Sequence, residues 1–137
     1  MPLARLCAVG LVLGIISTLP GCQQIGAMDI RGSLESPEIR ARGMGLFGPR
    51  AVCVRSLGVS DMWEVRSDIG ECVMLRTVKY GEVPKGFVER EPAKPLVAGV
   101  TYHASANGST GAIPNVPFRA YGAFIFQEGR WHRLDTQ

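Results

Sequence analysis

The chain has 137 residues, of which 46% are hydrophobic and 20% charged, and its formal net charge is +3. This composition is globular and excludes an intrinsically disordered chain, while the length suits one ordinary domain and not two well-buried cores. No block of like charges stands out, so nucleic acid is not indicated as a partner. The 17 glycines and 9 prolines follow no period and favour many short strands and turns over long helices.

Residues 1–21 have the pattern of a signal peptide. A positive region with Arg5 precedes an uncharged apolar run from Leu6 to Leu19. The run is shorter than the roughly 20 residues of a membrane-spanning helix and has the length of a secretory signal. It ends in Leu19-Pro20-Gly21-Cys22, which resembles the lipobox of bacterial lipoproteins. The resemblance implies cleavage before Cys22 and lipidation of its sulfur; an uncleaved anchor helix with a chance cysteine is the alternative.

The same resemblance implies where the mature chain resides. Bacterial lipoproteins are expected to carry three acyl chains, and since each buried methylene contributes about 0.8 kcal/mol, three chains make dissociation negligible. The residue after Cys22 is Gln23 and not the Asp that would favour retention in the inner membrane. We therefore expect a lipid anchor in the outer membrane, on its periplasmic face.

Residues 22–49 are expected to form the lipidated terminus and a flexible tether. Frequent Gly and Pro interrupt this segment, and a chain of this length spans roughly 25–30 Å. Within it, Glu38–Arg42 is the part that could dock as an edge strand. The segment Gly43-Met44-Gly45-Leu46-Phe47-Gly48 formally matches the GxGxxG dinucleotide fingerprint, but Pro49 and a strand follow it where the fingerprint needs a helix. We reject that match.

Two cysteines remain after the leader is removed and Cys22 is lipidated. Cys53 and Cys72 belong to a chain exported to an oxidising compartment, which predicts one disulfide between them. Closing that loop is worth roughly 3 kcal/mol by the chain-entropy estimate. A thiol catalyst is the alternative, but the sequence has no CxxC motif.

Residues 50–137 are predicted to form the single domain. Short β-type runs separate turn-rich connectors, the longest of which are Gly81–Pro95 and Asn107–Pro117. In the second run, Trp63 and Val65 alternate with polar neighbours, as in a half-buried strand. The predicted strands are Ala51–Leu57, Met62–Arg66, Cys72–Tyr80, Val97–Ala106, Arg119–Gln127 and Arg130–Leu134.

The last two runs predict a hairpin with a two-residue turn at Glu128-Gly129. Gln127 would then face Arg130, and Phe126 would face Trp131; such aromatic pairs stabilise hairpins by roughly 0.2–1 kcal/mol, and Gly supplies the positive φ of the turn. Together the strands predict an all-β fold, a small antiparallel β-sandwich of immunoglobulin-like architecture with six or seven strands. An open barrel is the alternative.

Catalytic and metal-binding patterns are weak. His103 and His132, the two histidines, could join Cys53 and Cys72 in a four-ligand site, but structural zinc ligands usually come in closely spaced pairs. GxSxG is absent. We therefore expect neither an enzyme nor a bound metal or cofactor; a hydrolase or metal enzyme with a cleft joining the two histidines is the third-ranked alternative.

The expected function is non-catalytic binding of another protein through loops, which carry recognition on rigid scaffolds. The open loop Asn107–Pro117 is the candidate surface. Its proposed contact residues are Asn107, Ser109, Thr110, Ile113, Asn115 and Val116. In its lipobox, size, β-rich body and cysteine pair, the chain is similar to small periplasmic immunity lipoproteins associated with type VI secretion, which implies a secreted toxin as partner. The alternative is a structural or assembly component of the cell envelope or of a secretion apparatus.

Overall fold

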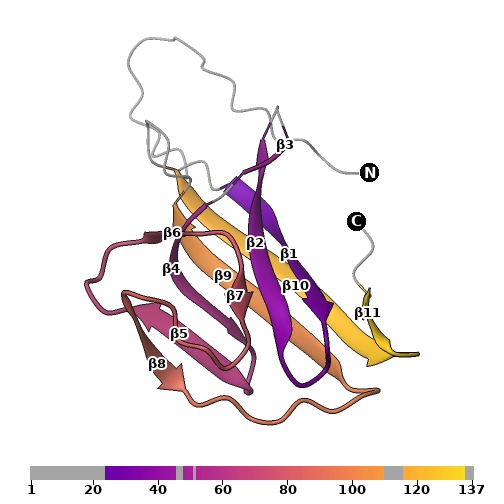
Figure 1. The fold of residues 1–137 in the computed structure, drawn as a ribbon. Coiled ribbons are helices and arrows are strands. Elements are labelled where there is room, and N and C mark those ends of the chain that lie inside the picture. The colour runs from indigo at the N-terminus through magenta and orange to yellow at the C-terminus, as the bar shows by residue number, and fades with distance from the viewer. Residues whose placement is uncertain (1–23, 46–47, 51, 110–115, 135–137) are drawn as a thin grey trace, which may run out of the picture.

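The computed structural model describes residues 24–45, 48–50, 52–109 and 116–134. These residues form eleven strands (Figure 1). The strands are β1 (Gln24–Gly32), β2 (Pro37–Gly45), β3 (Gly48–Arg50), β4 (Val52–Val59), β5 (Trp63–Ser67), β6 (Val73–Leu75), β7 (Val78–Lys79), β8 (Phe87–Glu91), β9 (Thr101–Ser109), β10 (Pro117–Gln127) and β11 (Arg130–Arg133). Within the described ranges, there is no helix of the length and apolar character needed to cross a membrane.

All eleven strands belong to one curled sheet, a half-barrel, in the order β3-β2-β1-β10-β9-β4-β5-β8. Strand β11 pairs with β10, β6 with β4, and β7 with β2, so the segment Val73–Lys79 spans from β4 to β2 across the curl. The β1–β10 pair is parallel and the other pairs are antiparallel. The prediction of an all-β fold is confirmed. The prediction of an immunoglobulin-like sandwich is not confirmed, because the strands form a single sheet with both parallel and antiparallel pairs.

The predicted C-terminal hairpin is confirmed residue by residue. Gln127 pairs with Arg130 and Phe126 with Trp131, and the rings of the second pair are 5.3 Å apart at their centroids. Both turn residues, Glu128 and Gly129, have positive φ (55° and 76°). Two consecutive positive φ angles give the turn the twist that suits a two-residue hairpin.

The predicted tether is wrong, because residues 24–45 form β1 and β2 inside the sheet. Met28 and Ile39 are fully buried in the core, so the folded domain includes β1 and β2 and is not confined to residues 50–137. Gly26, which looked like a flexible position, is needed for close packing: a Cβ there would lie 2.2 Å from the ring of Phe118. Glu38–Arg42 is a strand, as expected, within the longer β2. It is not an edge strand, because β2 pairs with β1 on one side and with β3 and β7 on the other.

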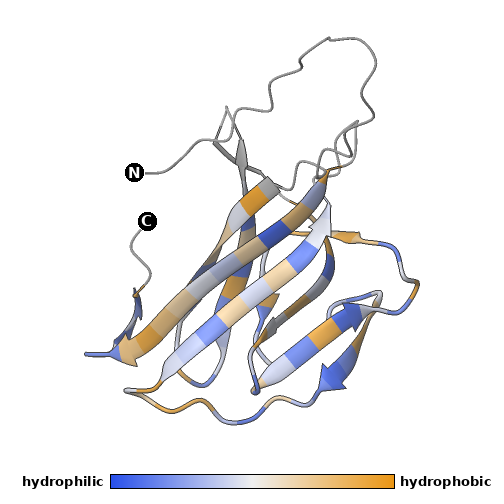
Figure 2. Ribbon diagram, turned by 180° about the vertical axis from the view of Figure 1, so that it is seen from behind, coloured by the Kyte–Doolittle hydropathy of each residue, from blue (hydrophilic) through white to orange (hydrophobic). Residues whose placement is uncertain are grey.

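The concave side of the sheet holds the hydrophobic core. Its largest fully buried side chains include Trp63, Phe118, Met28, Ile39 and Leu57. The predicted alternation along β5 is confirmed, since Trp63 and Val65 are buried between more exposed neighbours. Buried and exposed positions also alternate along β9 and along β10 from Pro117 to Phe124. The end of β10 next to β11 is continuously hydrophobic, as Figure 2 shows from behind.

Strand β4 keeps its apolar side chains inward through a bulge. The register against β9 shifts between Val54 and Ser56, which leaves Arg55 as the extra residue. An extra residue reverses the alternation of a strand. Val54 and Leu57, three positions apart, are therefore both buried.

Two other predicted segments differ from the structure. The run Cys72–Tyr80 is two short strands, and its side-chain parity changes at the break between them: Met74 is exposed, whereas Val78 and Tyr80 are buried. The predicted connector Gly81–Pro95 contains β8, which pairs with β5 through an inward-facing Phe87. Short strands of this kind carry too few residues to show a period in sequence.

Candidate functional site

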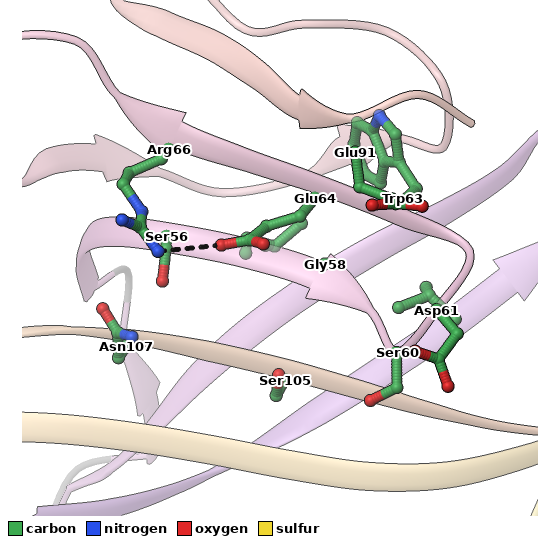
Figure 3. A pocket seen from close by; sticks show the side chains of 12 residues that line it. Ser56, Gly58, Ser60, Asp61, Trp63, Glu64, Arg66, Glu91, Ser105 and Asn107 are labelled. Atoms are coloured by element: carbon green, nitrogen blue, oxygen red, sulfur yellow. Dashed lines mark hydrogen bonds and ion pairs between the residues drawn. The ribbon is translucent and has the colours of Figure 1, made fainter.

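A shallow depression of ≈ 380 Å³ lies on the convex side of the sheet, over β4, β5 and β9 (Figure 3). Its floor consists of small residues: Ser56, Gly58, Ser60 and Ser105. A second depression of ≈ 380 Å³ continues it over β9 and β10 and shares Ser60 and Ser105 with the first. We call the two together the outer trough.

The strand register explains why the trough exists. Tyr121 of β10 pairs with Ser105 of β9, Ser105 with Gly58 of β4, and Gly58 with Glu64 of β5. Two small residues therefore lie between two long ones in one row across the sheet. No larger residue fits at position 58, because a Cβ on Gly58 would lie 2.3 Å from the carbonyl oxygen of Trp63.

The wall on the β5 side is polar and internally paired. Nη2 of Arg66 donates a hydrogen bond to Oε1 of Glu64 at 3.2 Å. Glu91, further along this side, pairs with Nζ of Lys94 at 3.2 Å, and the same ammonium donates to the backbone carbonyl of Asp61 at 2.8 Å. Because most of these charges have a partner of opposite sign, the trough is polar without a strong field of one sign.

The wall on the β10 side is partly apolar. Tyr121 is 54% exposed, and Ala123 and the exposed His103 line the same depression. Tyr121 therefore presents its ring and hydroxyl beside the small-residue floor. This side of the trough offers an aromatic contact, and the opposite side offers hydrogen bonds.

The candidate contact residues that the structure describes do not lie together in the one loop that the sequence predicts. Asn107 and Ser109 belong to β9 and not to a loop. Asn107 lines the outer trough, whereas Ser109 Oγ lies 3.3 Å from Sγ of Cys72. Val116 directly precedes β10. Thr110, Ile113 and Asn115 lie outside the described residues, so their proposed role stays a prediction.

The predicted disulfide between Cys53 and Cys72 is present, with the two Cα atoms 5.1 Å apart. It joins β4 to the residue preceding β6, its neighbour in the sheet. Because both sulfurs are part of this bond, they are not available as ligands for the alternative zinc site. Among the described residues, no three His, Cys, Asp or Glu side chains gather as a metal site.

The sequence does not predict the outer trough, because the residues that line it come from strands that are far apart in the chain. Its one local signal is the outward Ser and Gly positions of β4, which alternate with apolar ones. Comparisons with models of protein families, with curated proteins and with solved structures found no match. The residues of the chain itself therefore provide the basis for a functional proposal.

Proposed function

We propose that the chain is an outer-membrane-anchored periplasmic lipoprotein that binds another protein, without catalysis, through its outer trough. The observation that carries this proposal is the half-exposed Tyr121 beside a floor of small residues. Tyr and Arg are enriched among the residues that dominate binding energy at protein interfaces. A small-residue depression next to such a side chain can receive a projecting side chain of a partner.

The strands that carry these residues also favour recognition, because they are firmly paired in the sheet. Ser105 and Tyr121 belong to β9 and β10, which pair along nine consecutive positions from Pro117 to Ile125. A surface held by such a ladder loses little conformational freedom when it binds, so less binding energy is lost to ordering. Asn107 and Ser56 add hydrogen-bonding groups at one end of the trough.

The partner that we propose is a secreted toxin, which would make the chain an immunity protein. This choice rests on the similarity to small immunity lipoproteins in the lipobox, the length, the β-rich body and the cysteine pair. The proposed lipid anchor would hold such a protein at the periplasmic face of the outer membrane. Capture of an envelope component in place of a toxin would favour the assembly role.

The test is an affinity pull-down with soluble residues 23–137 as bait, against envelope extract and the products of neighbouring genes. Ser105→Arg fills the floor of the trough and should abolish capture of the partner. Thr101→Arg introduces the same charge at an exposed position on the same strand and should capture as wild type does. Both variants should keep the wild-type melting temperature. If Ser105→Arg captures the partner undiminished, the trough is not the binding surface.

A further inference from the structure

Only a short stretch of chain separates the proposed anchor point from the folded sheet. Strand β1 begins at Gln24, two positions after Cys22. An extended chain spans at most 3.3–3.6 Å per residue, so Gln24 can lie no more than about 7 Å from Cys22. A free tether of the expected length would have allowed roughly 25–30 Å.

The register shows which end of the sheet adjoins the anchor. β1 runs parallel to β10, with Gln24 opposite Phe118 and Ile25 opposite Arg119. β9 runs antiparallel to β10 and ends there too, with Ser109 opposite Pro117. These three strand ends form what we call the anchor end, represented by Ile25, Ser109, Pro117 and Arg119.

The side chains at the anchor end suit a lipid surface. Ile25 is 65% exposed, an unfavourable position for an aliphatic side chain in water. Arg119, its register neighbour, is also exposed, and a guanidinium forms paired hydrogen bonds with phosphate. An apolar side chain beside such a cation matches the boundary between acyl chains and headgroups.

We propose that the anchor end rests directly on the membrane surface, with Ile25 and Arg119 among the lipid headgroups. This inference rests on the proposed lipidation of Cys22. The strands then run away from the membrane, and the outer trough faces sideways. Tyr121 would then lie close to the membrane, because it is two positions beyond Arg119 on β10.

The test uses the full-length, lipidated chain in vesicles of phosphatidylethanolamine and phosphatidylglycerol that contain brominated acyl chains, which quench nearby tryptophan. Ile25→Trp places a probe at the anchor end. Thr101→Trp is the matched control: Thr101 is exposed and pairs with Ile125, six residues beyond Arg119 and so about 20 Å further along β10. Trp63 and Trp131 contribute the same background to both variants.

We expect the added tryptophan of Ile25→Trp to lose a large part of its emission and that of Thr101→Trp to lose little. Inserting ten Gly and Ser residues between Gln23 and Gln24 should reduce the quenching of Ile25→Trp to the control level. Equal, weak quenching of both variants, with acyl chains detected on Cys22 by mass analysis, would overturn this inference and leave the lipoprotein proposal standing. If the insertion leaves the quenching of Ile25→Trp unchanged, the short chain between Cys22 and β1 is not what holds the anchor end at the membrane, and that part of the inference is overturned. A Cys22 without acyl chains would overturn both proposals.

Discussion

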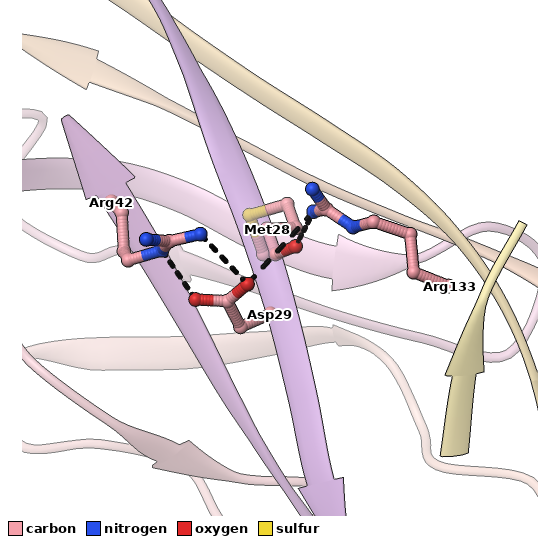
Figure 4. Close-up of polar contacts among 4 residues, drawn as sticks. All are labelled: Met28, Asp29, Arg42 and Arg133. Carbon is pink, nitrogen blue, oxygen red and sulfur yellow. Dashed lines mark hydrogen bonds and ion pairs between the residues drawn. The ribbon is translucent and has the colours of Figure 1, made fainter. Parts of the chain in front are cut away.

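Asp29 accepts a hydrogen bond from Nη2 of Arg42 at 3.1 Å, across β1 and β2 (Figure 4). Arg133 approaches the same carboxylate from β11, at 4.0 Å, and donates to the backbone carbonyl of Met28. The two guanidinium groups flank one carboxylate, so three strands from the two ends of the chain are linked. Strand β1 is thereby held by side chains as well as by its backbone ladders.

Replacing Asp29 should weaken this link measurably. Asp29→Asn leaves two guanidinium groups without their counter-charge and should lower the free energy of unfolding by about 1 kcal/mol, after allowance for solvent screening of a half-exposed pair. The control is Glu38→Gln, whose partner Arg31 has a side chain that is 75% exposed, so the loss should be near zero. Urea denaturation measures both; equal losses would show that the Asp29 cluster adds nothing specific.

A second prediction distinguishes an integral first strand from a tether. Met28 is fully buried, so Met28→Ala should lower the free energy of unfolding by about 2–5 kcal/mol, the range for large-to-small core substitutions. Ile25→Ala, on the same strand but 65% exposed, should change it by less than about 0.5 kcal/mol. A wild-type denaturation midpoint for Met28→Ala would contradict the placement of β1 in the core.

The disulfide gives a third prediction. Alkylation of the native exported protein without reductant, followed by mass analysis, should find neither Cys53 nor Cys72 modified. The Cys53→Ala/Cys72→Ala double variant should lose roughly 3 kcal/mol of stability, because the unfolded chain regains the freedom of the closed loop. Two alkylated thiols in the native protein would rule the bond out.

Tyr80 provides a pH-dependent prediction. Its hydroxyl donates to the carbonyl of Lys94 at 2.6 Å, and burial raises the pKa of this phenol above its ordinary value near 10. The folded state thus favours the neutral phenol, so the contribution of Tyr80 is complete below about pH 10 and is lost as pH rises through the raised pKa.

Thermal unfolding between pH 8 and pH 11 should show this difference. Tyr80→Phe should be less stable than wild type at pH 8, because it lacks the hydrogen bond, and it should lose less stability on going to pH 11. Other groups titrate equally in both proteins, so the comparison isolates Tyr80. Parallel losses of melting temperature in the two proteins would contradict the prediction.

The last prediction concerns the anchor. Cys22→Ala removes the sulfur that the lipobox presents for acylation, so the precursor should remain uncleaved and take up no labelled fatty acid. Gln23→Ala is a control that leaves the sulfur in place and should be processed normally. Maturation and membrane partitioning of Cys22→Ala like wild type would show that the leader is not a lipoprotein signal.

The sequence by itself determined the features that depend on neighbours in the chain. The Phe126–Trp131 register follows from a two-residue turn, the burial of Trp63 and Val65 follows from period-two alternation, and the all-β class follows from many such short runs. The Cys53–Cys72 bond could be predicted because only these two cysteines remain outside the leader and the lipobox. Each of these inferences needs only local geometry or a count.

Tertiary structure alone decided the roles of β1 and of the outer trough. Gly26 reads as a chain breaker, yet it faces Phe118, a ring that lies far away in sequence. The trough likewise depends on Ser105 lying between Gly58 and Tyr121, an order set by which strands pair. The residues next to a glycine or serine in the sequence do not show which strands will pair. The same small side chain permits flexibility in a linker and close packing in a sheet.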